Sequence, residues 1–307
     1  NYGNMLETGD GIETDLEESM KYYKMANDYG DSQGLYCYAL LMMNTQPDKN
    51  LAIKYLKNAI AGGNTNAMNY YANMLRSGDG IPVNPEEAVK YYKKAINLGN
   101  TEAMNHYSIM LIYGDEISAN TKEAAKYCKM AVDKGDSDAM CTYAWMHQKG
   151  IEFDVNKEEA IKYYKIAIDK GNAKAMNNYA YMLLIGDGIE TNKEEAIKYY
   201  KMAIEKDDLS AMNSYATLLR DGDGIPTNKL EASKLFKMAA DKGNSKAMNN
   251  YAFMLSEGDG IEINKEEAIK YYKMAIQKGN SNAMCNFGTM LYYGDGIEAN
   301  KEEAFKY

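Results

Sequence analysis

Few side chains in this chain of 307 residues have a type and spacing that could support covalent catalysis. A nucleophilic hydrolase needs a serine or cysteine beside a base that a third group holds in place. His106 and His147 are the only histidines, no GxSxG motif is present, and none of the twelve serines is followed by lysine three residues later. We therefore predict that the chain is not an enzyme.

Pairs of adjacent glutamates, such as Glu194-Glu195 and Glu266-Glu267, are the residues best suited to acid–base chemistry. They recur just after an asparagine that has the features of a helix start. Negative charge at that place interacts favourably with the helix dipole. We therefore interpret the acidic pairs as structural residues.

The recurring Gly-Asp-Gly segments, as at 186–188, do not match loops that bind phosphate or calcium. A phosphate loop has a longer glycine pattern followed by lysine, and an EF-hand has acidic residues at alternating positions with glycine sixth. The four cysteines stand at irregular spacings without a CxxC pair, which indicates neither a disulfide framework nor a zinc site. The sequence thus predicts no metal and no cofactor. The cysteines favour a reducing compartment such as the cytoplasm, and the localisation is otherwise unknown.

An internal repeat in the sequence determines which helices and loops carry these residues. The dipeptide Ala-Met recurs every 36 residues, and Gly34 occupies the same place 33 residues before the first copy. The copies begin at Ala67, Ala103, Ala139, Ala175, Ala211, Ala247 and Ala283. We expect a single repeat domain over 1–307, divided into 1–33 (partial), 34–66, 67–102, 103–138, 139–174, 175–210, 211–246, 247–282 and 283–307 (partial). Neither end has a polar capping copy, so we expect a segment of a longer protein.

Each copy has the pattern of two helices joined by a glycine turn. In the copy from Ala175, apolar residues recur at helical spacing over 175–183 and again over 196–204. Asn192 marks a helix start, and Gly171 marks the end of the second helix of the preceding copy. A lone hairpin cannot bury its apolar stripes. The sequence therefore predicts an all-α, right-handed α-solenoid of stacked antiparallel helical hairpins.

Three substitutions at turn glycines predict local departures from this geometry. Glu116 and Glu152 each replace the second glycine of a loop between the helices, and we expect altered turns there. Asp207 replaces the glycine that ends a second helix. Keeping the left-handed conformation at that position would cost on the order of 1 kcal/mol.

The order of small, aromatic and glycine positions resembles the Sel-one-like repeat, a relative of the tetratricopeptide repeat. The residues that carry the resemblance are Tyr179-Ala180, Leu183, Gly186-Asp187-Gly188-Ile189, Asn192, Ala196, Tyr199-Tyr200 and Ala203, with Gly171 and Gly243 as terminal glycines of other copies. Tyr-Ala stands where the family usually has Leu-Gly, and Tyr-Tyr where it has Trp-Tyr. The resemblance implies an adaptor or scaffold that binds proteins along a curved surface, with the first helices on its concave side.

The first helix of each copy carries another stripe on the side opposite its core positions. Asparagine recurs there, and side-chain amides can pair with the backbone of an extended peptide. The position four residues later varies from copy to copy and is bulky in the middle three. The predicted binding residues are Asn105, Ile109, Ile112, Trp145, Asn177, Tyr181, Leu184, Asn213, Asn249 and Phe253. We expect Trp145 to anchor an apolar patch within this set.

The predicted function is a non-catalytic scaffold or adaptor that binds a protein or peptide. A net charge of −9 argues against nucleic acid as a partner, and no apolar run is long enough for this segment to insert into a membrane. The alternative is a spacer or regulatory arm of a larger protein whose enzyme domain lies outside this segment. A lactam-binding hydrolase, suggested by some bacterial relatives, is less favoured because the cysteine pairs of those relatives are missing.

Overall fold

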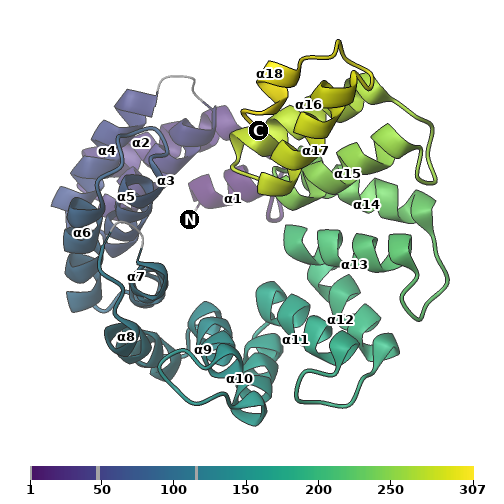
Figure 1. The fold of residues 1–307 in the computed structure, drawn as a ribbon. Coiled ribbons are helices and arrows are strands. Elements are labelled where there is room, and N and C mark those ends of the chain that lie inside the picture. The colour runs from purple at the N-terminus through teal and green to yellow at the C-terminus, as the bar shows by residue number, and fades with distance from the viewer. Residues whose placement is uncertain (1, 46–48, 115–116) are drawn as a thin grey trace. The chain divides into compact units, whose positions relative to one another are not determined.

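The computed structural model describes residues 2–45, 49–114 and 117–307. All regular elements in these residues are helices, and the chain forms two compact units, Asn1–Val155 and Asn156–Tyr307. Within each unit, consecutive helices pack as hairpins along the chain (Figure 1). The prediction of an all-α chain of stacked helical hairpins is confirmed.

The odd-numbered helices are the first helices of the repeats, and the even-numbered helices are the second ones. The first unit contains α1 (Tyr2–Thr8), α2 (Leu16–Asp28), α3 (Ser32–Thr45), α4 (Lys49–Ala61), α5 (Thr65–Ser77), α6 (Pro85–Asn97), α7 (Thr101–Tyr113), α8 (Thr121–Asp133) and α9 (Ser137–Lys149). The second unit contains α10 (Lys157–Asp169), α11 (Ala173–Ile185), α12 (Lys193–Glu205), α13 (Leu209–Asp221), α14 (Lys229–Asp241), α15 (Ser245–Glu257), α16 (Lys265–Gln277), α17 (Ser281–Tyr293) and α18 (Lys301–Ala304). Consecutive first helices also pack on each other, as α7 does on α9 and α15 on α17.

Asparagine side chains begin most of the helices, as the sequence predicts. The side-chain oxygen of Asn192 accepts from the N–H of Glu195, and the backbone N–H of Asn192 donates to the carbonyl of Leu183 in α11 (2.9 Å). Because that N–H is already bonded, the Glu195 carboxylate accepts from Asn192 Nδ2 instead (3.2 Å). The N-cap therefore joins the two helices of the hairpin and determines where the second one begins.

The glycine loop between the two helices is held by the preceding repeat. Gly186 and Gly188 have φ angles of +73° and +77°, which residues with a Cβ rarely adopt. A Cβ on Gly188 would also lie 2.2 Å from the Cβ of Lys157. Lys157 Nζ pairs with Asp187, between the two glycines, at 2.8 Å. The same pairing recurs at Lys49–Asp79, Lys193–Asp223, Lys229–Asp259 and Lys265–Asp295.

The turns that lack a glycine keep the glycine conformation. Glu152 has a φ of +64°, so the altered turn predicted there does not occur. Its carboxylate accepts from Thr121 Oγ1 (2.6 Å), and Thr121 stands where most other repeats have the pairing lysine. Asp207 also has a φ of +64° and pairs with Lys242 of the next repeat. Glu116 lies outside the described residues.

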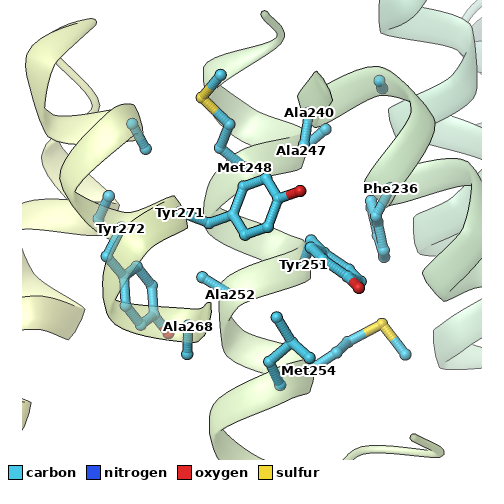
Figure 2. Packing of buried hydrophobic residues seen from close by; sticks show 14 of the residues in the cluster. Phe236, Ala240, Ala247, Met248, Tyr251, Ala252, Met254, Ala268, Tyr271 and Tyr272 are labelled. Atoms are coloured by element: carbon cyan, nitrogen blue, oxygen red, sulfur yellow. The ribbon is translucent and has the colours of Figure 1, made fainter. Parts of the chain in front are cut away.

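The core of each unit is built from alanine, methionine and tyrosine. In the second unit, Met248, Tyr251 and Met254 of α15 pack in one cluster with Phe236 of α14 and Tyr272 of α16 (Figure 2). All five side chains are buried. The apolar stripes that the helical spacing predicts are therefore buried between the helices.

Lysines of the second helices lie over the tyrosines of the next repeat. Lys165 Nζ is 5.6 Å from the ring centroid of Tyr179, which also meets Tyr199 edge-on at 5.1 Å. The same contact recurs at Lys57–Tyr71, Lys93–Tyr107, Lys201–Tyr215, Lys237–Tyr251 and Lys273–Phe287. These contacts join the second helix of one repeat to the first helix of the next.

Candidate binding face of the first helices

The predicted stripe lies on the first helices, and each unit holds part of it. Trp145 belongs to the first unit and Tyr181 to the second, so each is described within its own unit. We call the register of Asn177 the amide row and the register of Tyr181 the outer row. The amide row consists of Asn69, Asn105, Asn177, Asn213 and Asn249, and the other two repeats have cysteine at the same register, Cys141 and Cys285. The outer row consists of Asn73, Ile109, Trp145, Tyr181, Thr217, Phe253 and Thr289.

The amide row is more buried than the helical periodicity predicts. Only 4% of Asn105 and 8% of Asn249 is exposed, whereas Asn177 and Asn213 are partly buried. The prediction of a solvent-facing amide is thus corrected for Asn105 and Asn249. The reason is that consecutive first helices pack directly on each other, which covers this register.

The amides bond to one another from repeat to repeat. Asn250 Nδ2 donates to Asn213 Oδ1 at 2.9 Å, and Asn286 Nδ2 donates to Asn249 Oδ1 at 3.0 Å. We call such a bond, between an amide-row residue and the residue 37 positions later, an amide rung. Each rung occupies the oxygen of an amide that we expected to bind a peptide backbone.

A histidine forms the corresponding rung in the first unit. His106 Nδ1 lies 2.9 Å from Asn69 Oδ1, while Asn69 Nδ2 donates to the Glu102 carboxylate (3.2 Å). An ionised carboxylate only accepts hydrogen bonds, so Asn69 must present its oxygen to His106. The same nitrogen lies 3.2 Å from Asn73 Nδ2, so the tautomer of His106 decides whether it donates to Asn69 or accepts from Asn73.

Two rungs are open. The side-chain oxygens of Asn105 and Asn177 are buried and have no hydrogen-bond partner among the described residues. The residues 37 positions later are Thr142 and Ser214, whose side chains are shorter than that of asparagine. Thr142 Oγ1 donates to the carbonyl of Asp138 in its own helix instead. The residue type at this later position therefore decides whether a rung closes.

In the first unit, Trp145 of the outer row forms an aromatic pair with Tyr113. Tyr113 is 63% exposed, and its ring centroid lies 6.0 Å from that of the partly buried Trp145. Ile109 and Ile112, on the same helix as Tyr113, are partly buried. The sequence analysis did not include Tyr113 in the site. Its spacing of four residues from Ile109, which places both on one helix face, is the signal that would have found it.

The outer row of the second unit also presents large apolar side chains. Tyr181 is 49% exposed and Phe253 is 39% exposed, while Leu184 is partly buried. Ile185, four residues after Tyr181, is 52% exposed and was not in the predicted set. The accessible part of the candidate site is therefore apolar, and most of its amides face neighbouring repeats.

Burial and hydrogen bonding shift the pKa values of two side chains in the described chain, Cys128 and Lys237. Burial raises the pKa of the Cys128 thiol to about 12, so this thiol stays protonated at neutral pH. A hydrogen bond with Tyr271 raises the pKa of Lys237, which keeps this ammonium group charged. Among the described residues, no group of three or more His, Cys, Asp or Glu could hold a metal ion. None of the described helices has both the length and the apolar character needed to cross a membrane.

The chain is similar in fold to several solved repeat proteins. A Sel1 repeat protein from Oxalobacter formigenes shares 20% identity over 94% of this chain and 84% of that one, with a TM-score of 0.57. A protective antigen of uropathogenic Escherichia coli with an SLR fold shares 20% identity over 99% of this chain and 73% of that one, with a TM-score of 0.51. Yeast Tom70 shares 19% identity over 89% of this chain and 58% of that one, with a TM-score of 0.54. At these identities the likeness shows the fold alone.

A family model described as the Sel1 repeat matches nine successive stretches of the chain. These are residues 1–31, 27–64, 65–100, 101–136, 137–172, 173–208, 209–244, 245–280 and 281–307. No curated protein sequence matches the chain. Because the family model covers the chain from end to end, the protein belongs to the Sel1 repeat family.

Proposed function

We propose that this chain is a protein-binding scaffold whose first helices take up a segment of a partner protein. Repeats of this family and of the related tetratricopeptide fold are generally protein-interaction modules. The observation that carries the proposal is the exposure of the aromatic side chains of Tyr113, Tyr181 and Phe253 on first helices. Aromatic side chains of this kind supply much of the binding energy at protein interfaces.

The close packing of consecutive first helices supports the proposal by fixing the position of the outer row. Closed rungs add to this packing between α5 and α7, between α13 and α15, and between α15 and α17. The outer-row side chains are therefore presented from packed helices and not from loops. Binding to a preorganised surface loses less conformational entropy than binding to a mobile one.

Photo-crosslinking tests which residues contact a partner. We expect benzoylphenylalanine placed at Trp145 or at Tyr181 to crosslink a defined protein segment in an extract of the native cells, identified by mass spectrometry. The control carries the same label at Lys198, an exposed residue of a second helix. Equal labelling from Lys198, or no product from Trp145 and Tyr181, would contradict the proposal and favour a spacer.

The double variant Trp145→Ala with Tyr181→Ala measures the contribution of the outer row. With the identified segment as a peptide, the variant should bind at least about tenfold more weakly, which corresponds to about 1.4 kcal/mol. Its circular dichroism should match the parent, because neither side chain lies in the fully buried core. An unchanged Kd would show that the partner binds elsewhere.

A further inference from the structure

A pocket of about 440 Å³ lies in the second unit, where α14 of one repeat meets α15 and the glycine loop of the next. Its apolar wall consists of Tyr251 and Leu255 of α15 and Ile261 of the loop. Tyr251 and Leu255 are buried, and Ile261 packs against the hydrophobic core. None of the residues predicted to bind a partner lines this pocket, so it is separate from the candidate binding face.

Ser233 of α14 leaves room in the pocket at a register that larger aliphatic residues fill in most repeats. In α4, α6, α8, α10, α12 and α16 the equivalent residues are Ile53, Val89, Ala125, Ile161, Ile197 and Ile269. Ser233 is buried, and its hydroxyl donates to the carbonyl of Leu230 in its own helix (2.8 Å). An aliphatic group of a ligand can take the place of the missing isoleucine side chain and supply its packing contacts with the wall.

Two side chains of opposite charge at the rim of the pocket are available to a ligand. Lys234 of α14 and Glu262 of the loop are both exposed, and neither forms an ion pair with any of the described residues. The other charged residues of the lining, Lys237 and Glu267, are hydrogen-bonded within the protein. The pocket therefore offers a ligand one ammonium group and one carboxylate beside an aliphatic surface.

We propose that this pocket binds a free α-amino acid with a branched aliphatic side chain, such as isoleucine, leucine or valine. The aliphatic side chain lies beside Ser233, the carboxylate pairs with Lys234, and the ammonium group pairs with Glu262. Because both charged residues are exposed, most of the affinity comes from burial of the aliphatic side chain. The site is specific to this repeat, since α12 and α16 have isoleucine at the register of Ser233.

Titration of the intact chain with L-isoleucine, followed by methyl NMR, tests the ligand class. We expect the methyl signals of Leu255, Ile261 and Ile263, which line the pocket, to shift. Three matched probes each lack one contact: L-serine has no aliphatic side chain, N-acetyl-isoleucine has no ammonium group, and isoleucine amide has no carboxylate. Each should bind at least about fivefold more weakly than L-isoleucine. Equal binding of L-serine, or of both modified isoleucines, would contradict recognition of an aliphatic amino acid.

Substitutions in α14 decide whether L-isoleucine binds in this pocket. Ser233→Ile fills the pocket with the side chain that α12 and α16 have at this register, so the variant should keep the circular dichroism of the parent and lose the methyl shifts. Ser233→Ala keeps the space and should retain them. Lys234→Gln should weaken binding, whereas Lys198→Gln, the same change one repeat earlier, should leave the Kd unchanged. Unchanged binding by Ser233→Ile, or no binding of L-isoleucine to the parent, would overturn the proposal.

Discussion

Asp207 shows how a single residue can adopt a backbone conformation that normally requires glycine. Its N–H donates to Ile204 (2.8 Å), just as the N–H of Gly171 donates to Ile168 (2.7 Å) in the equivalent turn. The left-handed conformation is disfavoured for residues with a Cβ, although aspartate tolerates it better than most. The ion pair with Lys242 offsets part of this strain, but both side chains are largely exposed and such pairs are weak.

Two substitutions of Asp207 test whether backbone strain or the ion pair with Lys242 has the larger effect on stability. Asp207→Gly should raise the free energy of unfolding by about 0.5–1 kcal/mol, because relief of backbone strain exceeds the loss of an exposed ion pair. Asp207→Ala should lower it by a similar amount, since alanine keeps the strain and loses the ion pair. Urea denaturation followed by circular dichroism measures both. A shift in the same direction for both variants would show that strain does not dominate at this turn.

At the scale of the helices, the contacts between repeats follow one pattern and vary only where the residues change. The lysine at the start of a second helix pairs with the aspartate of the next glycine loop, and Thr121 pairs with Glu152 where the lysine is missing. The amide rungs vary in the same way. They close where the later residue is asparagine or histidine and stay open at Thr142 and Ser214.

Substitutions between serine and asparagine at the later position should close or open individual amide rungs. Ser214→Asn places an amide opposite the buried oxygen of Asn177 and should stabilise the second unit by about 0.5–1.5 kcal/mol. Asn250→Ser removes the donor to Asn213 and should destabilise the same unit by at least as much. Thermal and urea denaturation of the two variants beside the parent measure the difference. If Ser214→Asn destabilises the protein, α11 and α13 do not approach closely enough for a rung.

At the scale of the whole molecule, the described helices of each unit pack mainly on near neighbours along the chain. A second helix packs on its own first helix and on the next one, as α14 does on α13 and α15. Stability in such arrays is approximately a sum of repeat terms and neighbour terms. Removing one complete repeat should therefore leave the remaining interfaces intact.

Deletion of residues 209–244 tests this additivity. The deletion joins Asp208 to Ser245, so an N-cap residue again precedes α15, and Asn250 comes to the position of Ser214. Circular dichroism at 222 nm should then show the same helicity per residue as the parent, to within about a tenth. We also expect the open rung at Asn177 to close on Asn250, which NMR of the side-chain amides would detect.

A matched deletion of half a repeat provides the control. Removing 209–226 leaves α14 without its own first helix and should lower the helicity per residue. If the complete-repeat deletion loses as much helicity as this one, the repeats are not independent structural modules.

The sequence by itself determined the repeat, the hairpins and most helix ends. Asn192 accepts from the N–H three residues later, and Gly171 takes the left-handed conformation that ends the preceding helix. These signals act within a few residues of one another. They are therefore readable wherever the pattern recurs, and the family membership follows from the same repetition. The periodicity also placed Tyr181 and Phe253 correctly on the surface.

Only the tertiary structure decided which polar side chains remain accessible. The helical wheel gives the direction of Asn249 from its own axis, but not the distance to the next first helix, and close packing there buries the amide and bonds it to Asn286. The contact of Tyr113 with Trp145 likewise joins two repeats. Periodicity along one helix cannot report such features, because they depend on how far apart separate helices pack.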